Sequence, residues 1–350
     1  MARTLADLEA QKNRFVTSPD DTTIQAEANQ DQAPLAPLSE PSIRLPDDVG
    51  LSAAPPSAPA SSTRRKPNST IERIKTLEQM DSHFIFPFGR SQSGKTVAMS
   101  SLIYFMSSVD SGGKLHAWDS PYGSADETHA YIREVNKMFA SKHFPSRTMF
   151  ASDAQWDRTR QINVDFVPTD TQRKRIRLTF VDMSGDDHQD FADGNGKQGL
   201  PPSIEIFFQA NRLSLTFVLV TRHQDAHNDD EMMVSFLNHI IKRDPSFERA
   251  RVLLLVSHWD TYSGDDDISA FVKRRMPMTY AKTLNPHNAM INFTIGAVGS
   301  TQDDDGNAEA SFIKEFDPSP SRKILHWLYQ SFIGVPLVRV AWWKKFLKAV

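Results

Sequence analysis

The chain has 350 residues, a formal net charge of −3 and no cysteine. This length corresponds to one to three domains. The lack of cysteine excludes disulfides, thiolate metal sites and cysteine nucleophiles, and the nearly balanced charge gives no reason to expect a nucleic acid partner. No apolar run approaches the roughly 18 residues that span a bilayer, and the first residues lack the apolar core of a secretory signal. We therefore expect a soluble, cytoplasmic protein.

Residues 1–70 differ in composition from the rest of the chain. They are rich in Pro, Ser, Ala, Asp and Gln, and they end in the small basic cluster Arg64–Lys66. Such a segment cannot bury enough apolar surface to offset the entropy of ordering it, so we predict a disordered tail with one short helix over Leu5–Phe15. A tail that docks a partner or directs localisation is the alternative to a plain solvated linker.

A strand, a tight loop and an apolar helix follow one another directly after this tail. The strand covers His83–Phe88, and the apolar run that predicts the helix covers Val97–Met106. The loop between them matches the pattern G-x-x-x-x-G-K-[ST] at every fixed position, with Gly89, Arg90, Ser91, Gln92, Ser93, Gly94, Lys95 and Thr96 in order. Since the motif lies between a strand and a helix, it has the context that a phosphate-binding loop requires.

Each fixed position of this loop has a chemical role. Gly89 and Gly94 allow backbone conformations that a β-carbon would block, so successive amide N–H groups can point at phosphate oxygens. The start of the helix adds the positive end of its dipole. Lys95 can reach the β- and γ-phosphates, and the Thr96 hydroxyl can ligate Mg²⁺. The loop therefore predicts a nucleoside triphosphate site.

Strand and helix patterns alternate through the rest of the chain. A Gly-containing turn at 110–113 and a loop to about Ser124 precede a helix over residues 125–144. Alternating strands at Ile162–Val167 and Arg175–Val181, joined by a short turn, predict an antiparallel hairpin. Near-continuous apolar runs predict central strands at Leu215–Val220 and Val252–Val256.

A last strand is expected at Ile291–Ile295. Helices are expected at Ile204–Asn211, Glu231–Lys242, Ile268–Lys282 and Ser321–Ile333. The chain thus predicts a three-layer α/β P-loop NTPase fold over residues 71–336, with a mostly parallel sheet and one antiparallel edge hairpin. The acidic runs, Asp229–Glu231 among them, are expected to be solvated loops and helix starts.

Three further motifs follow predicted strands. Asp182 and Gly185 come after the strand that ends at Val181, at the edge of the sheet where ligands bind in open α/β folds. Ser257-His258-Trp259-Asp260 follows the strand Val252–Val256, and a loop of small residues, Gly296–Gly299, is expected after the last strand.

In this order, the motifs resemble those of the translation-factor-like GTPases of Ras-type fold, and the long insertions are most similar to the bacterial double-GTPase branch. The resemblance implies that GTP and Mg²⁺ are bound, with the metal held by Thr96 and Asp182 and the γ-phosphate sensed by Gly185. It also implies that Asp260 accepts hydrogen bonds from guanine N1 and N2, and that the Ala297 N–H meets guanine O6.

The sequence departs from this family at three places. Ser257 and His258 replace the usual Asn or Thr and Lys, and His258 could stack on the purine. Asp186 replaces the usual Gln that orients the attacking water. Either Asp186, Asp187 or His188 takes over that role, or the protein hydrolyses GTP weakly or not at all. The switch threonine is Thr148, beside the potential internal arginine finger Arg147, or Thr159.

The C-terminal segment, residues 337–350, contains Trp342, Trp343 and Phe346 among lysines. As a helix it would be amphipathic, which suits a peripheral membrane contact or a partner groove, while packing back on the domain is the alternative. We expect a GTP-binding switch with slow hydrolysis that acts through a protein partner or self-association. The alternatives are an ATP-hydrolysing P-loop ATPase and a nucleotide-bound scaffold without turnover.

Overall fold

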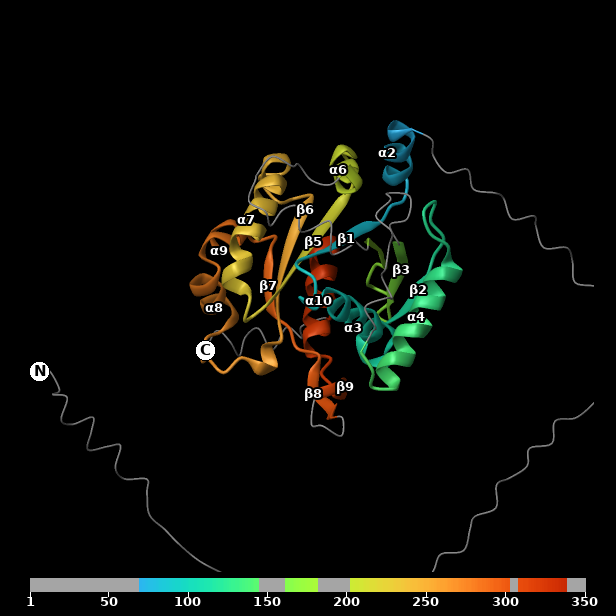
Figure 1. Ribbon diagram of the computed structural model, residues 1–350. Helices are drawn as coiled ribbons and strands as arrows, with labels where there is room; N and C mark the ends of the chain where they lie inside the picture. The colour runs from blue at the N-terminus through green and yellow to red at the C-terminus, as the bar shows by residue number, and fades with distance from the viewer. Residues whose placement is uncertain (1–68, 145–160, 182–201, 303–307, 339–350) are drawn as a thin grey trace, which may run out of the picture. The chain divides into compact units, whose positions relative to one another are not determined.

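A seven-stranded sheet forms the centre of the fold (Figure 1). The computed structural model describes residues 69–144, 161–181, 202–302 and 308–338. In spatial order, the strands are β2 (Gly113–Ala117), β3 (Gln161–Pro168), β4 (Ile176–Val181), β1 (His83–Phe88), β5 (Ser214–Arg222), β6 (Ala250–Ser257) and β7 (Ala289–Asn292). β3 is antiparallel to both of its neighbours, and every other pair in the sheet is parallel. The predicted mostly parallel α/β sheet is confirmed.

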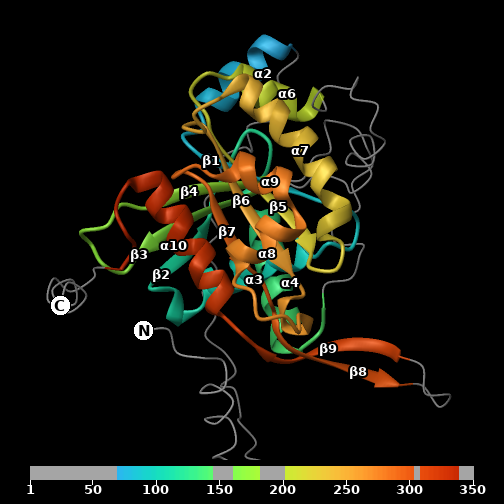
Figure 2. The same cartoon turned by 90° about the vertical axis from the view of Figure 1, so that its left-hand side faces the viewer.

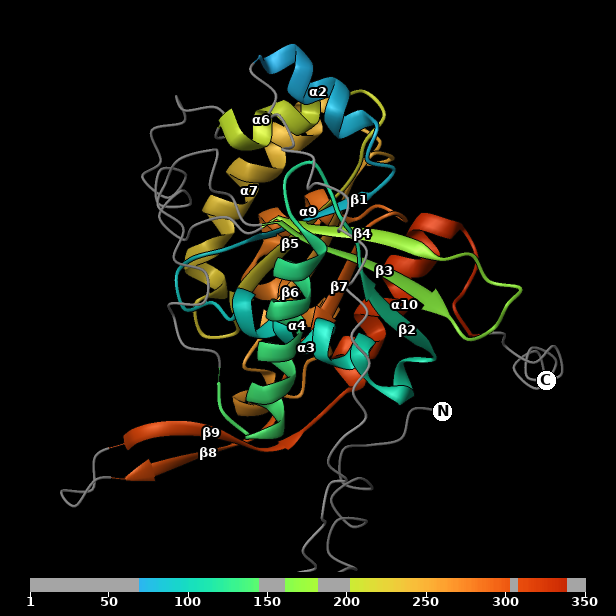
Figure 3. The same cartoon turned by 90° about the vertical axis from the view of Figure 1, so that its right-hand side faces the viewer.

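Helices cover both faces of this sheet, as the two opposite views in Figures 2 and 3 show. One face carries α2 (Thr70–Glu78), α6 (Pro202–Gln209), α7 (Ala226–Arg243), α8 (Ile268–Arg275) and α9 (Pro277–Thr283). The other face carries α3 (Lys95–Ser107), α4 (Ala125–Ala140) and α10 (Ser319–Ile333). Each face of the sheet has its own hydrophobic core, and successive side chains of a strand point into one core and then the other. In β1, Phe84 and Phe86 face the first layer of helices and Ile85 faces the second. This is a three-layer arrangement.

Several predicted boundaries are wrong. The expected loop up to Ser124 contains strand β2, whose pairing with β3 brings Gly113 under the ring of Phe166. The single helix predicted over Ile268–Lys282 is two helices, because Pro277 lacks the N–H that a continuous helix needs and begins α9 instead. The last sheet strand, β7, begins and ends earlier than the predicted strand Ile291–Ile295.

A second, two-stranded sheet lies beyond β7. β8 (Gly296–Gln302) and β9 (Ala308–Phe316) form an antiparallel hairpin that extends away from the main sheet (Figures 2 and 3). The base of the hairpin is attached to the domain, since the Ile313 N–H donates to the Lys142 carbonyl at 2.8 Å and the Ile313 side chain is buried. The sequence analysis did not predict this hairpin and placed a loop at its start.

The predictions for the two ends of the chain concern residues that the structure does not describe. The tail with its short helix and the segment that begins at Trp342 lie outside the described residues. Helix α2 begins the described part at its N-terminal end, with the Ser69 hydroxyl accepting a hydrogen bond from the Glu72 N–H. Among the residues that the structure describes, none of the helices combines the length and apolar character needed to cross a bilayer.

His83, at the start of β1, is a titratable group in a largely apolar setting. Its ring stacks on Phe332 of α10, with ring centroids 3.8 Å apart and planes 6° from parallel. Burial, reinforced by the positive charge of Arg251, lowers the pKa of His83 from 6.5 to about 4. The unfolded chain therefore binds this proton more tightly than the folded chain.

We predict that protonation of His83 weakens the fold as the pH falls from about 6.5 to about 4. The shift corresponds to up to about 3 kcal/mol of unfolding free energy, present above pH 6.5 and lost below pH 4. In His83→Phe, urea unfolding at pH 7 and pH 4.5 should differ by less than in the wild type. His116→Gln, at an exposed position of β2, is the control and should keep the full wild-type difference. An unchanged pH dependence in His83→Phe would contradict the assignment.

Candidate functional site

The loop of residues 89–94 lies at the carboxyl end of β1, in the middle of the sheet. From β1 the chain continues into α3 on one face of the sheet, whereas from the neighbouring strand β5 it continues into α7 on the other face. Chain connections that leave in opposite directions open a crevice between two parallel strands, and ligands of open α/β sheets bind in such crevices. The sheet order therefore brings the predicted phosphate loop to this position.

Glycine is needed at the two fixed positions of the loop for two different physical reasons. Gly89 has φ +150°, and a β-carbon there would lie 2.1 Å from the carbonyl oxygen of Val220 in β5. Gly94 has φ +94° and forms the N-cap of α3, a left-handed conformation that L side chains rarely adopt. No side chain of the described residues caps α3, and the amide groups of its first turn have no carbonyl within the helix to donate to.

Lys95 and Thr96 are the first two residues of α3. The Lys95 ammonium bends back over the loop and donates to the carbonyl oxygens of Gly89 at 2.6 Å and of Arg90 at 2.7 Å. Thr96 is half-buried, and Ser91 and Gln92 are exposed. The buried Ser93 hydroxyl has no hydrogen-bond partner in the part of the chain that the structure describes. It lies close to where a Gly89 β-carbon would be, at the inner side of the loop.

Ser257, at the end of β6, attaches the loop to the sheet. Its buried hydroxyl lies 2.7 Å from the Ser93 carbonyl oxygen and 3.2 Å from the Thr221 carbonyl oxygen of β5. Both carbonyls can only accept, so the serine donates and can itself accept from His258 Nδ1, 3.1 Å away. Ser257 was expected only as a departure from a family pattern, yet it links the ends of β5 and β6 to the loop.

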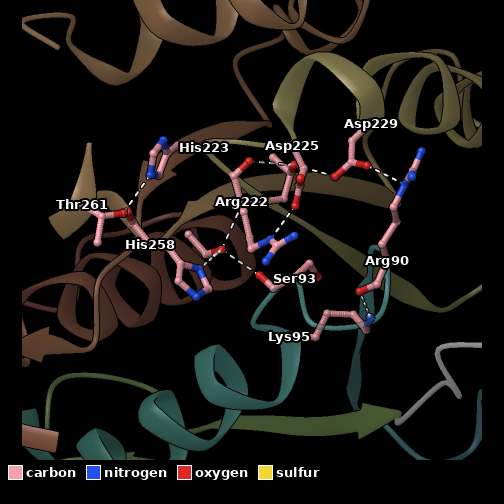
Figure 4. A network of polar contacts seen from close by, with 11 residues as sticks. Arg90, Ser93, Lys95, Arg222, His223, Asp225, Asp229, His258 and Thr261 are labelled. Atoms are coloured by element: carbon pink, nitrogen blue, oxygen red, sulfur yellow. Dashed lines mark hydrogen bonds and ion pairs between the residues drawn. The ribbon is translucent and has the colours of Figure 1, made fainter. Parts of the chain in front are cut away.

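Arg90 is held by the first turns of α7 (Figure 4). Its Nε lies 2.7 Å from Oδ1 of Asp229, and its Nη2 donates to the Asn228 carbonyl at 3.1 Å. The other carboxylate oxygen of Asp229 accepts from the Thr221 hydroxyl at 2.6 Å. Burial raises the pKa of Asp229, while the Thr221 hydrogen bond and the Arg90 charge oppose that rise.

The expectation that the run Asp229–Glu231 is solvated is wrong for its first two residues. The side chains of Asp229 and Asp230 are 1% and 4% exposed. Asp230 accepts from the backbone N–H groups of Met278 and Thr279 at the start of α9, at 3.1 and 2.8 Å. The two neighbouring acids therefore have different partners: one holds the loop and the other holds a helix.

Residues 258–261, which directly follow β6, form one wall of the site. His258 has φ +55°, and residues Trp259–Thr261 form the short 3₁₀ helix η5. Asp260 is exposed and accepts from the Thr294 hydroxyl at 3.2 Å. His223 directly follows β5, and its Nε2 lies 2.8 Å from the hydroxyl oxygen of Thr261.

The two histidines at this wall favour their neutral forms. Partial burial, followed by the charge of Arg222, lowers the pKa of His258. Burial, followed by the neighbouring His258, lowers the pKa of His223. A neutral His258 ring is compatible with stacking on an aromatic base, and its Nδ1–H can donate to Ser257.

Ala297 lies in strand β8, where it pairs with Glu315, and the predicted small-residue loop over Gly296–Gly299 is therefore wrong. Thr294, just before β8, contacts Asp260 instead. Its hydroxyl donates to the Asp260 carboxylate and accepts from the Gly296 N–H at 3.0 Å. Thr294 was not among the predicted site residues.

The remaining predicted site residues cannot be placed. Thr148, Asp182, Gly185, Asp186 and His188 lie outside the described residues, as do the alternatives Arg147 and Thr159. Within the described ranges, no group of three or more His, Asp or Glu side chains could hold a metal ion. Thr96 is thus the one predicted magnesium ligand whose position in the described part of the chain is known.

No protein-family model matches the sequence, and no curated protein matches it either.

We predict that Gly89→Ala disrupts the loop far more than a glycine replacement that meets left-handed backbone strain alone. Gly112, with φ +72° and nothing within 4 Å of the position that a β-carbon would take, is the control. Gly112→Ala should lower the unfolding free energy by about 1 kcal/mol, the cost of the left-handed conformation alone. Gly89→Ala should cost at least about 3 kcal/mol, because its β-carbon also meets the Val220 carbonyl. Urea denaturation measures both values, and equal losses would contradict the close contact.

Proposed function

We propose that the chain binds GTP with Mg²⁺ in the crevice at the carboxyl end of β1 and acts as a molecular switch. The observation that carries the proposal is the loop of residues 89–96 at the topological switch point of the sheet. Its tight approach to Val220, the amide groups at the start of α3 and the Lys95 ammonium suit a polyphosphate. The Ser93 hydroxyl, which has no partner among the described residues, adds a donor at the inner side of the loop.

In this proposal, phosphates replace the carbonyl oxygens that Lys95 now contacts. The backbone N–H groups of the loop and of the first turn of α3 hold the phosphate oxygens, and Lys95 neutralises charge on the β- and γ-phosphates. Thr96 and Asp182 would hold Mg²⁺, which supplies charge neutralisation between these phosphates when bound, and Gly185 would contact the γ-phosphate.

The base would lie against the wall formed by His258 and Asp260. The Asp260 carboxylate, held by Thr294, can accept from the two donors that guanine presents at N1 and N2, whereas adenine offers no matching pair. His258 would stack on the purine. If this wall has no role in base recognition, an ATP-hydrolysing P-loop ATPase becomes the better description.

The switch would work through loss of the γ-phosphate. Segments around Thr148 and Ser184–Gly199 would be released when that phosphate leaves, and a protein partner or self-association would sense the change. Asp186 replaces the usual glutamine, so we expect hydrolysis by the isolated protein to be slow, on the order of 10⁻⁴ to 10⁻² s⁻¹. In addition to Lys95, the candidate catalytic groups are Thr148, Asp186 and His188. A peripheral membrane contact would come from the C-terminal Trp/Lys segment.

We predict that Lys95→Ala weakens the binding of a fluorescent GTP analogue by about a hundredfold or more, because it deletes a charge-assisted contact to the phosphates. Titration of the purified protein measures the affinity, and thermal unfolding checks that the fold is retained. Lys75→Ala, at an exposed position of α2, is the control and should bind like the wild type. Wild-type affinity in Lys95→Ala would contradict the proposed phosphate site.

We predict that Asp260→Asn changes the choice of base. The asparagine amide can donate where the carboxylate only accepts, so the variant should lose affinity for GTP and gain affinity for xanthosine triphosphate. Competition of unlabelled GTP, ATP and xanthosine triphosphate against the fluorescent analogue measures the order of preference. Asp265→Asn, an exposed residue of the following loop, should leave that order unchanged. An unaltered preference in Asp260→Asn would favour the ATPase alternative.

A further inference from the structure

Asp229 is a buried carboxylate whose charge needs a physical explanation. It lies in the first turns of α7 with its side chain 1% exposed. Its charged partner, Arg90, has a side chain that is 48% exposed and comes from the phosphate loop. A buried acid paired with a half-exposed base is weak support for stability, because desolvation of the acid offsets most of the attraction. The pair is therefore better explained by what it positions.

The described contacts anchor the loop at three places. Gly89 packs against the Val220 carbonyl of β5, and the Ser93 carbonyl accepts from Ser257 of β6. Arg90, between these points, is anchored through its side chain to Asp229 (Figure 4). Its Nη2 also donates to the Asn228 carbonyl. This third anchor comes from the helix that follows β5, on the face of the sheet opposite to α3.

Arg90 connects this anchor to the lysine of the loop. Its side chain meets Asp229, and its carbonyl oxygen accepts from the Lys95 ammonium at 2.7 Å. The orientation of this one residue therefore affects both the start of the loop and the place of Lys95. The Asp229 carboxylate also keeps the Arg90 guanidinium directed toward α7.

The orientation of Asp229 is itself fixed. Its second oxygen accepts from the Thr221 hydroxyl at 2.6 Å, and Thr221 is the residue that follows Val220 in β5. Its Oδ1 makes an ion pair with Arg90 without a well-aligned hydrogen bond. The carboxylate thus attracts the guanidinium mainly through charge, and an uncharged group of the same shape would lose that attraction.

We propose that Asp229 is a positioning residue of the phosphate loop: through its charge it orients Arg90, and thereby sets the place of the loop amides and of Lys95 for the phosphates of a nucleotide. This inference rests on the proposed function. Asp229 has no contact with the nucleotide in this proposal and acts through Arg90 alone.

The matched pair Asp229→Asn and Asp230→Asn tests the proposal in the full-length protein. Both substitutions neutralise a buried acid of α7, but Asp230 holds the start of α9 instead of the loop. Titration with a fluorescent GTP analogue should show about tenfold weaker binding for Asp229→Asn and unchanged affinity for Asp230→Asn. Thermal unfolding of both variants accompanies the titrations. Equal loss of affinity in the two variants would overturn the proposal, because a general effect on the fold would then suffice.

A double-variant cycle tests whether Asp229 acts through Arg90. Arg90→Ala should weaken binding about as much as Asp229→Asn, and the combined variant should show no further loss. Arg90→Lys keeps the charge and should bind more tightly than Arg90→Ala. Additive losses in the double variant would show that Asp229 acts by another route and would contradict the inference.

Failure of this inference can be told apart from failure of the proposed function. If the wild type binds none of GTP, ATP or xanthosine triphosphate, the proposed function is wrong and the inference with it. If the wild type binds, Lys95→Ala does not, and Asp229→Asn binds like the wild type, the phosphate site stands and the positioning role of Asp229 is wrong.

Discussion

The close approach of Gly89 to the carbonyl oxygen of Val220 is the contact on which the site depends. It brings the backbone of the loop against the neighbouring central strand with no room for a β-carbon. The start of the loop is therefore positioned by β5, the strand after which the chain leaves for the opposite face of the sheet. The position of α3, and with it the direction in which its first amide groups point, follows from this contact.

Buried polar groups gather around that contact, while the layers of the domain are otherwise built from alternating apolar side chains. Thr221, Ser257 and Asp229 are buried at the carboxyl ends of β5 and β6 and at the start of α7. Burying a polar group costs free energy unless it is hydrogen-bonded, and these groups bond to one another's strands and to the loop. Their side chains therefore hold the loop, whereas the apolar cores hold the layers.

The accuracy of sequence-based prediction varied with the length and pattern of each element. Strands β5 and β6 were predictable because continuous apolar runs are typical of strands that are covered on both faces. Strand β2 was missed because five residues at a sheet edge carry no clear period, and its conformation comes from pairing with β3. The run Asp229–Glu231 was misjudged because a charged residue in a sequence does not reveal whether a partner will bury it.

The sequence by itself determined the phosphate-loop pattern, the order of most strands and helices, and the two apolar faces of the sheet, because each of these is a local pattern of glycine, charge or hydrophobic period. Only the tertiary structure decided that Ser257 reaches Ser93 from 164 residues away and that Asp229 meets Arg90. Such partners come together only once the strand order is set. The pairing of β1 with β5 and of β5 with β6 therefore made these contacts, which no local pattern could specify.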